Sequence, residues 1–250
     1  MRRFFAPSET VDLDRGSIVI TGVDSEHIAR VLRMKPEQEL EIADNRDRIY
    51  TTRILSVSPD LVKLKIIGIQ SADHEPELEL TLLQALPKGK KMDWIVRRAS
   101  ELGVNRIIPI FTERTIVRLK PEKKAERRDR WQRIAREAGK QAKRGRIVEV
   151  TPPEPLSESL SQIKTADLIL APWIDAANGI KEVLLEYGER PRSAAYFIGP
   201  EGGFTKREVA ELKEAGAVPV SLGPRIFRTE TAGLVVAAIL LYQFGEMEKL

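Results

Sequence analysis

Two glycine-containing segments near the carboxyl end of the chain carry the residues best suited to bind a ligand. Residues 199–205 read GPEGGFT and directly follow the apolar run 194–198. Three glycines within five residues remove side chains that would keep a ligand away from the backbone. The segment contains no G-x-G-x-x-G pattern, and no Lys-Ser or Lys-Thr pair follows its glycines, so a kinase or NTPase is poorly supported.

The second segment, residues 222–232, reads LGPRIFRTETA and again lies between a predicted strand and a predicted helix. Residues 171–173, which follow an earlier strand, could supply a third wall of the same pocket. A simpler explanation for each feature exists: Thr229 and Thr231 can cap the helix, and Arg228 can pair with a nearby acid. Taken together, the three segments favour a ligand site.

The elements that would position these segments alternate between strand and helix from residue 78 onwards. Apolar runs predict strands at 78–86, 106–111, 167–171, 194–198 and 218–222. Helical spacing and capping residues predict helices at 92–102, 122–144, 176–187, 229–244 and directly after Thr205. Such alternation is typical of a mainly parallel sheet covered on both faces, in which ligands bind outside the carboxyl ends of the strands.

The amino-terminal part of the chain has a different pattern. Short β-branched runs predict strands at 17–20, 39–42, 49–55 and 61–66. One helix, capped by Ser25, is expected between the first two strands, with Ile28, Val31 and Leu32 on one face. Several strands and one helix in so short a stretch indicate a small barrel. Residues 71–77 are polar and contain a proline, so we predict a barrel domain at 1–70, a linker at 71–77 and an α/β domain at 78–250.

The net charge of +4 hides an uneven distribution. Residues 88–146 contain 20 basic and 7 acidic side chains, a net charge of +13. A concentrated positive block creates a local field that attracts polyanions. A solvated helix surface is the alternative explanation, but the concentration of charge favours a nucleic-acid partner.

The composition excludes several other classes of protein. The 250 residues are 42% hydrophobic and 31% charged, with two histidines and no cysteine. The absence of cysteine excludes disulfide scaffolds, thiolate zinc sites and cysteine nucleophiles, and we expect no bound metal. The apolar run 232–241 has about half the length of a membrane span. Residues 1–5 lead into acidic, polar sequence, unlike a signal peptide, so we expect a cytoplasmic protein that does not bind membranes.

The two glycine-containing segments closely resemble the signature of the RsmE family, the bacterial 16S ribosomal RNA uridine N3-methyltransferases of the SPOUT superfamily. Further similarity runs nearly from end to end, at residues 2–5 (RRFF), 27–33 (HIARVLR), 86–89 (LPKG), 94, 99–104 (ASELGV), 114–115 (RT) and 141–144 (QAKR). The resemblance implies an α/β protein: a PUA-like RNA-binding β-barrel followed by a SPOUT α/β methyltransferase domain with a carboxyl-terminal trefoil knot. It also implies S-adenosylmethionine as cofactor, 16S rRNA in the small ribosomal subunit as substrate, and a homodimer.

The resemblance further implies which residues form the site. Cofactor contacts, largely from the backbone, would come from Pro172, Trp173, Ile198, Gly199, Gly202, Leu222, Gly223, Ile226, Thr231 and Ala232. RNA contacts would come from Arg2, Arg3, Arg30, Arg33, Lys88, Arg114, Arg127, Arg128, Arg133, Gln141, Lys143 and Arg144.

Catalysis requires that uracil N3 be aligned with the methyl donor and lose its proton. Alignment alone can supply several kcal/mol of the barrier. Arg228 is our first candidate for the cation that stabilises the developing uracil anion, and Glu230 or Glu201 could accept the proton. Alternatively, Glu201 holds the glycine turn together and Glu230 is a helix N-terminal acid favoured by the dipole. We expect His27 to be structural or to face RNA, and His74 falls in the predicted linker.

The chain departs from the family pattern at three places. Arg98 stands where lysine is usual, Lys140 where glutamate is usual, and residues 36–39 where a glycine-aspartate pair is usual. None of these changes removes a glycine turn, and the first two keep or raise the positive charge. Because arginine and lysine are not equivalent, a proton-transfer role cannot be assumed for Arg98.

Two other functions remain open from the sequence. A SPOUT enzyme that methylates the ribose 2′-oxygen of RNA would use the same cofactor turns. A non-catalytic RNA-binding or ribosome-assembly factor would contain these turns only as structural features. The position of the methyl group on the nucleoside distinguishes the two methyltransferases, and failure to bind S-adenosylmethionine would support the non-catalytic factor.

Overall fold

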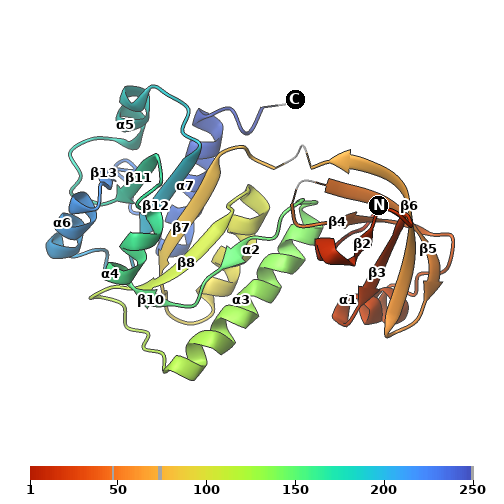
Figure 1. Ribbon diagram of the computed structural model, residues 1–250. Helices are drawn as coiled ribbons and strands as arrows, with labels where there is room; N and C mark the ends of the chain where they lie inside the picture. Colours follow the sequence, from red (N-terminus) through yellow and green to blue (C-terminus); the bar gives the residue numbers. More distant parts are fainter. Residues whose placement is uncertain (47, 73–74, 249–250) are drawn as a thin grey trace. The chain divides into compact units, whose positions relative to one another are not determined.

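A computed structural model describes residues 1–46, 48–72 and 75–248 (Figure 1). Its contacts divide the chain into two compact units: Met1–Glu75 with Arg136–Ile147, and Pro76–Ala135 with Val148–Leu250. Two residues of the predicted linker, Asp73 and His74, lie outside the described residues. The domain boundaries at 70 and 78 stay a prediction, and the contacts add residues 136–147 to the amino-terminal unit.

The first unit is built on a six-stranded sheet with the order β1-β4-β5-β6-β3-β2. Its strands are β1 (Arg3–Phe5), β2 (Val11–Asp12), β3 (Ser17–Thr21), β4 (Glu39–Ala43), β5 (Arg48–Val57) and β6 (Leu61–Ser71). All neighbours are antiparallel except β1 and β4. Among the described residues no pairing joins β1 to β2, so the small barrel predicted from the sequence is an open half-barrel.

Short helical turns complete this unit: η1 (Ser8–Thr10), α1 (Val23–Glu26) and the π-helical turn η2 (His27–Val31). The prediction that Ser25 caps this helix was wrong. Gly22 precedes the first helical residue, and the Ser25 hydroxyl donates to the carbonyls of Gly22 and Pro59. Ile28 is fully buried as expected, but Val31 is 66% exposed, because the π-helical turn changes the spacing on which the predicted face relied.

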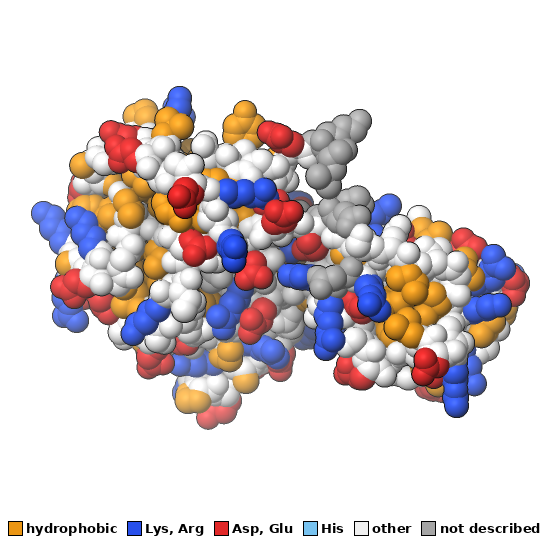
Figure 2. Space-filling model, turned by 45° about the horizontal axis from the view of Figure 1, so that its top comes forward, with side chains coloured by type: hydrophobic (Ala, Val, Ile, Leu, Met, Phe, Trp, Pro, Cys, Tyr) orange, Lys and Arg blue, Asp and Glu red, His pale blue; other side chains and the backbone are white. Residues whose placement is uncertain are grey.

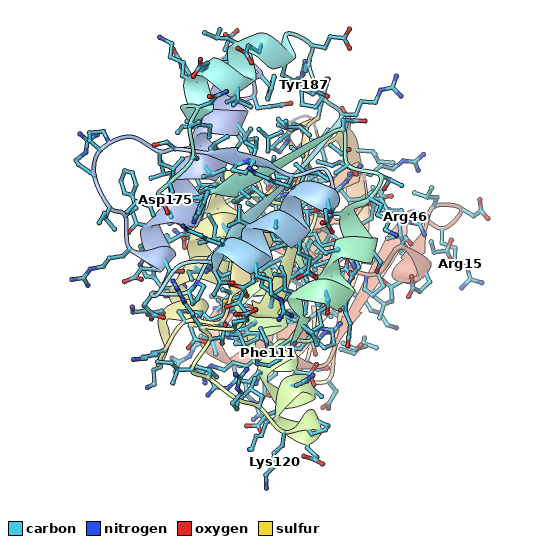
Figure 3. The ribbon with its side chains drawn as sticks, turned by 90° about the vertical axis from the view of Figure 1, so that its left-hand side faces the viewer. Arg15, Arg46, Phe111, Lys120, Asp175 and Tyr187 are labelled. Atoms are coloured by element: carbon cyan, nitrogen blue, oxygen red, sulfur yellow. The ribbon has the colours of Figure 1, made fainter. Side chains whose placement is uncertain are left out.

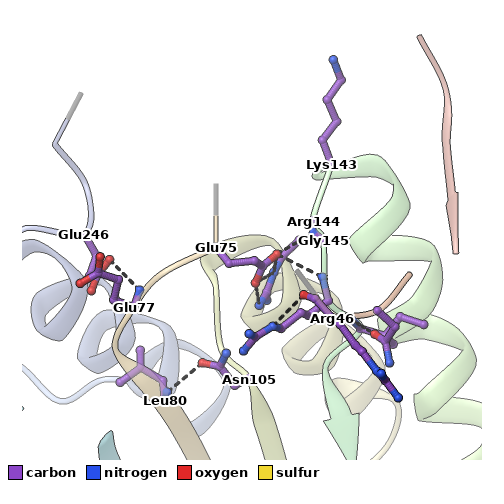
Figure 4. Close-up of polar contacts among 12 residues, drawn as sticks. Arg46, Glu75, Glu77, Leu80, Asn105, Lys143, Arg144, Gly145 and Glu246 are labelled. Atoms are coloured by element: carbon purple, nitrogen blue, oxygen red, sulfur yellow. Dashed lines mark hydrogen bonds and ion pairs between the residues drawn. The ribbon is translucent and has the colours of Figure 1, made fainter. Parts of the chain in front are cut away.

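Two buried carboxylates tie residues 136–147 to the rest of the first unit. Asp24 accepts hydrogen bonds from Arg136 at 2.8 Å and Lys140 at 2.6 Å. Glu75 accepts from Arg144 at 2.6 Å and from the Gly145 backbone at 2.7 Å (Figure 4). Burial raises the pKa of each carboxyl, but the hydrogen bonds and nearby charges outweigh it, so both pKa values lie below the ordinary range.

The second unit contains a parallel sheet with the order β10-β8-β7-β12-β11-β13, and β9 pairs with β8. Its strands are β7 (Glu79–Ala85), β8 (Arg106–Phe111), β9 (Glu149–Val150), β10 (Glu154–Pro155), β11 (Leu168–Pro172), β12 (Ser193–Ile198) and β13 (Val218–Val220). Its helices are α2 (Lys91–Leu102), α3 (Pro121–Gln141, whose last six residues group with the first unit), α4 (Leu156–Ser159), η3 (Leu160–Ile163), α5 (Ile180–Tyr187), α6 (Lys206–Glu214) and α7 (Thr229–Gln243).

Alternating side chains of the strands form a core on each face of this sheet. In β12, Tyr196 packs into the core that contains residues of α2, α3, α5 and α7, whereas its neighbour Phe197 packs into the core that contains α4, η3 and α6 (Figure 1). This two-sided burial explains the nearly continuous apolar strands and confirms the predicted parallel α/β fold. Within residues 1–46, 48–72 and 75–248, no helix is long and apolar enough to cross a membrane.

Strand order decides where the ligand-binding segments meet. The strands β12 and β13, which precede the two glycine-containing segments, are not neighbours in the sheet, because β11 lies between them. The turn after β11 is therefore the middle one of three at the carboxyl ends of neighbouring parallel strands. Figure 3 labels Asp175, an exposed residue of this middle turn.

Candidate functional site

Backbone hydrogen bonds join the turn after β11 to the turn after β13. The Trp173 amide donates to the Val220 carbonyl at 3.0 Å, and the Ser221 amide donates to the Asn178 carbonyl at 2.9 Å. Gly223 follows with a φ of 96°, a left-handed conformation that a side chain would strain. These bonds hold residues 172–178 and 220–223 as one surface at the end of the sheet.

The turn after β12 folds tightly on itself. A Cβ atom on Gly199 would lie 3.2 Å from the Phe204 nitrogen and 3.3 Å from the Gly203 carbonyl carbon. Because both neighbours are backbone atoms, only glycine fits without a shift of the chain. The turn ends in a capping box in which Thr205 and Glu208 bond to each other's backbone amides, as predicted from their spacing.

A buried hydrogen-bond chain connects this turn to α7 and to the end of β7. The Thr229 hydroxyl donates to the Gly199 carbonyl at 2.7 Å and accepts from the Gln84 amide at 2.9 Å. Gln84 is fully buried and Thr229 is 6% exposed. Thr229 thus binds the glycine turn and does not cap its helix, because the N-cap residue of α7 is Arg228 and no side chain makes a capping bond there.

The two acids predicted as proton acceptors come together on one lysine. Lys91, the first residue of α2, places its Nζ 3.1 Å from Glu201 Oε1 and 3.3 Å from Glu230 Oε2. The Lys88 backbone amide adds a second hydrogen bond to Glu201 Oε1 at 3.2 Å. Glu230 Oε2 is buried and has no hydrogen-bond partner among the described residues. The sequence interpretation did not single out Lys91.

The contacts in this cluster shift the pKa values of Glu201 and Lys91 in opposite directions. Burial raises the pKa of Glu201, but hydrogen bonds from its own backbone, Lys91 and Lys88 outweigh that effect and lower the pKa below its ordinary value. The hydrogen bond to Glu201 raises the pKa of Lys91, and the negative charges of Glu201 and Glu230 raise it further against the opposing effect of desolvation. A protonated lysine cannot accept a proton, so Lys91 is no general base.

Arg228 lies at the start of the same helix as Glu230. Its backbone carbonyl accepts hydrogen bonds from the Thr231 and Ala232 amides, both at 2.9 Å. Its side chain is exposed, and its guanidinium has no hydrogen bond or ion pair with another described residue. The guanidinium is therefore available to a ligand, whereas the carboxylates of Glu201 and Glu230 form ion pairs with Lys91.

Arg114, which we predicted to contact RNA, is exposed and also touches the glycine turn. Its guanidinium donates to the Gly202 carbonyl at 2.6 Å, and a Cβ on Gly202 would lie 3.3 Å from its Cδ. One residue earlier, the Glu113 amide donates to Glu208 of the capping box at 2.7 Å. The segment after β8 thus supports the turn after β12.

The remaining predicted cofactor residues differ in exposure. Ile226 is 83% exposed, whereas Ile198 at the end of β12 is 2% exposed. Gly202 and Gly223 are exposed, and the half-buried members are Pro172, Trp173, Gly199, Leu222, Thr231 and Ala232. Backbone and apolar groups therefore line the edge formed by the three turns.

The predicted RNA-binding residues fall into two groups. Arg3 and Arg144 are each 5% exposed; Arg3 pairs with Glu41, and Arg144 pairs with Glu75. Their prediction as RNA ligands stays untested, but burial makes the others better candidates. Those others are exposed (Arg2, Arg30, Arg33, Lys88, Arg114, Arg133, Gln141 and Lys143) or half-buried (Arg127 and Arg128). On the face drawn in Figure 2, basic side chains alternate with acidic ones.

Among the described residues, no group of three or more histidine, cysteine, aspartate or glutamate side chains is arranged to hold a metal ion. The Lys91 cluster has a cation of its own between its two carboxylates.

Comparison with known proteins defines the class. Residues 74–241 match the family model of the RNA methyltransferase domain, and residues 20–67 match that of the RNA methyltransferase PUA domain. The chain thus combines the two parts that the amino-terminal half-barrel and the parallel α/β sheet indicate.

Curated relatives define the family more closely. Ribosomal RNA small subunit methyltransferase E from Bacillus subtilis is 29% identical over 97% of both chains, and that from Buchnera aphidicola (subspecies Schizaphis graminum) is 32% identical over 88% of both. The crystal structure of the Neisseria gonorrhoeae enzyme, bound to S-adenosyl methionine, is 30% identical over 97% of both chains, with a TM-score of 0.85. The chain belongs to the ribosomal RNA small subunit methyltransferase E (RsmE) family, which confirms the family predicted from the two glycine-containing segments.

Proposed function

We propose that this chain transfers the methyl group of S-adenosylmethionine to N3 of a uridine in 16S ribosomal RNA of the small subunit. The observation that carries the proposal is the edge where the turns after β12, β11 and β13 meet, lined by backbone groups and flanked by Arg228 and Glu230. Family membership and the cofactor bound to the Neisseria relative support it.

The residues at this edge fit S-adenosylmethionine. A cofactor that is held largely through backbone contacts needs turns without obstructing side chains, and a Cβ on Gly223 or Gly203 would meet nothing within 4 Å. Exposed Ile226 and half-buried Leu222 offer apolar contact to the flat adenine ring. The full set that would hold the cofactor is Pro172, Trp173, Ile198, Gly199, Gly202, Leu222, Gly223, Ile226, Thr231 and Ala232.

When bound, S-adenosylmethionine supplies an electrophilic methyl group on a sulfonium. The residues of this chain must align uracil N3 and stabilise the negative charge that develops as its proton leaves. Arg228 meets the second requirement, because its side chain is exposed and its guanidinium has no hydrogen bond or ion pair with another described residue. A preorganised cation at a developing anion is among the larger contributions to catalysis.

Glu230 is the better candidate of the two proton acceptors. The lowered pKa of Glu201, caused by its own backbone, Lys91 and Lys88 against the effect of burial, makes that carboxylate a weak base. Glu230 has only an ion pair with Lys91 at 3.3 Å, and its Oε2 in that pair accepts no hydrogen bond from a described residue. The N3 proton would pass to Glu230 and from there to solvent.

RNA capture would use the exposed basic residues. The target base must be unstacked to reach the site, as in a single-stranded loop or by flipping. Phosphate contacts from Arg2, Arg30, Arg33, Arg133 and Lys143 would make RNA affinity fall as salt rises. Affinity that does not change with salt would remove these residues from the proposal.

The remaining predictions form part of the same proposal. Residues 1–70 would bind RNA and residues 78–250 would carry the reaction, with the turns after β12 and β13 threaded as a trefoil knot. The active form would be a cytoplasmic homodimer. Sedimentation equilibrium of the purified protein tests the dimer directly, and a single species of 28.2 kDa would contradict it.

The decisive experiment identifies the product. Purified protein is incubated with methyl-labelled S-adenosylmethionine and small ribosomal subunits that lack the modification, and the labelled nucleoside is identified by mass spectrometry. We expect 3-methyluridine. A label on ribose would favour a 2′-O-methyltransferase, and no label together with no cofactor binding would favour a non-catalytic RNA-binding or assembly factor.

The cofactor placement has its own test. Valine at position 199 would push against the Phe204 and Gly203 backbone atoms, so Gly199→Val should abolish binding of S-adenosylmethionine in calorimetry. Gly68→Val is the control, because Gly68 lies in strand β6 of the first unit and a Cβ there would meet Thr51 Cβ at 3.6 Å, an ordinary contact distance. Unchanged affinity in a folded Gly199→Val protein would refute the placement.

A further inference from the structure

Lys91 joins two parts of the candidate site that are far apart in the sequence. Glu201 lies in the turn after β12, and Glu230 is the second residue of α7. The lysine reaches both from the first turn of α2, at 3.1 Å and 3.3 Å. Three separate elements, each at the proposed cofactor edge, thus converge on one ammonium group.

The two carboxylates need this cation. Both approach the same nitrogen within 3.3 Å, so they lie close enough to repel each other strongly if it is removed. The site is partly shielded from solvent, because the side chains of Glu201, Lys91 and Glu230 are 36%, 35% and 17% exposed. Glu230 has the least exposed side chain of the three.

Contacts next to Glu201 and next to Glu230 also fix the spacing between the glycine turn after β12 and α7. The Lys88 amide also donates to Glu201, so the segment 88–91 binds the glycine turn through two donors, this amide and the Lys91 ammonium group. Thr229, next to Glu230, binds the Gly199 carbonyl at 2.7 Å. The distance between the glycine turn and α7 is therefore set by one polar contact from Thr229 and one charge bridge through Lys91.

We infer that Lys91 is a positioning residue for the methyl-donor site: it holds the glycine turn after β12 and the first turn of α7 at the spacing that S-adenosylmethionine requires. The inference rests on the proposed function. It assigns Lys91 no proton transfer and no direct contact with substrate, and it gives Glu201 a role in holding the turn, one of the alternatives open from the sequence.

The test measures cofactor affinity without RNA, by calorimetry on the full-length protein. Lys91→Met keeps the length of the side chain but removes its charge, and we expect affinity to fall about 5- to 30-fold, the range that 1 to 2 kcal/mol produces. Lys91→Arg can still bridge both carboxylates and should stay within about threefold of wild type. The matched control is Lys90→Met, since the neighbouring Lys90 makes no side-chain capping bond to α2.

A second variant separates charge repulsion from loss of packing. Adding Glu201→Gln to Lys91→Met leaves a single carboxylate, so affinity should recover in part if repulsion causes the defect. A purely structural lysine predicts a lower melting temperature with unchanged affinity of the folded protein, and a packing defect predicts no recovery. Either result, or a Lys91→Arg protein as weak as Lys91→Met, overturns the inference.

The wild-type measurement keeps the two proposals distinguishable. If wild-type protein binds S-adenosylmethionine and Lys91→Met binds it equally well, the inference fails and the proposed function stands. If the wild type itself does not bind the cofactor, the proposed function fails and the role of Lys91 fails with it.

Discussion

Each compact unit of this protein pairs two carboxylates with basic side chains, but the two clusters are built differently. In the first unit, Asp24 and Glu75 are buried and each has its own cation and several donors. In the second, Glu201 and Glu230 share Lys91, and one buried oxygen has no hydrogen-bond partner among the described residues. The first arrangement favours stability, whereas the second leaves groups available for a ligand.

The two clusters differ in burial, so we expect loss of an ion pair to lower the free energy of unfolding by different amounts in each. A buried charge that loses its partner is strongly destabilising, while an exposed ion pair contributes about 0 to 1 kcal/mol. Variants in the first cluster should therefore change the free energy of unfolding, and variants in the second should change function more than stability. Four predictions test this comparison, in order of decreasing effect on stability.

The largest effect is expected for Arg144→Met. The substitution leaves the Glu75 carboxylate buried without its guanidinium, which should lower the free energy of unfolding by about 3–5 kcal/mol. Urea denaturation measures the change. Lys143→Met is the matched control, because the adjacent side chain is exposed, and similar losses in both variants would contradict the special role of the buried pair.

Thr229→Val should have an intermediate effect on the free energy of unfolding. It tests the comparison because a variant in the second unit should here change both stability and function. It lies in the second unit, yet its hydroxyl is buried between Gln84 and the Gly199 carbonyl. Leaving these groups unpaired should cost about 1–3 kcal/mol and also weaken binding of S-adenosylmethionine. Thr229→Ser retains the hydroxyl and should restore both; calorimetry and urea denaturation on the same preparations would expose any failure to do so.

Low pH should destabilise the folded protein through the first cluster, the carboxylates of Asp24 and Glu75. Burial raises the pKa of Asp24 and of Glu75, but their basic partners lower both below the ordinary values in the folded state. Their stabilisation is therefore complete above the ordinary values of about 4 and is lost as the pH falls through the lower folded values. The free energy of unfolding, measured from pH 7 to pH 3, should drop below about pH 4, and the drop should be smaller in Asp24→Asn. Parallel curves for the two proteins would argue against this assignment.

Glu201→Gln should have the smallest effect on stability. The side chain is 36% exposed, so loss of its ion pair should change the free energy of unfolding by less than about 1 kcal/mol. A loss as large as that of Arg144→Met would mean that both clusters serve stability and would remove the distinction between them.

Local pattern predicted most of the fold. The apolar runs at β7, β8, β11 and β12 predicted the parallel sheet, because strands buried on both faces are apolar along their whole length. Some short elements were missed. The three residues of β1 read RFF, too few to show alternation. The helical turns at 156–163 carry Leu156, Leu160 and Ile163 at a helical spacing that the prediction overlooked.

The ion pairs of the two clusters could not be predicted from local sequence patterns. Lys91 lies 110 residues from Glu201 in the sequence, and Arg144 lies 69 residues from Glu75. No periodicity connects such positions, because only the order of strands and the docking of helices bring them together. The one available signal was that Lys91 stands at the start of a predicted helix directly after the segment 86–89.

Residues 136–141 of α3 belong to the first unit, so the half-barrel cannot be transferred to another protein as one continuous stretch of sequence. A gene fragment that stops at Glu75 would encode all six strands but not Arg136, Lys140 or Arg144. Expressed alone, this fragment would leave Asp24 without its two basic partners and would end at a Glu75 that lacks Arg144. Recombination must therefore transfer a discontinuous stretch of sequence, or supply substitutes for the three missing cations, before this module can be reused elsewhere.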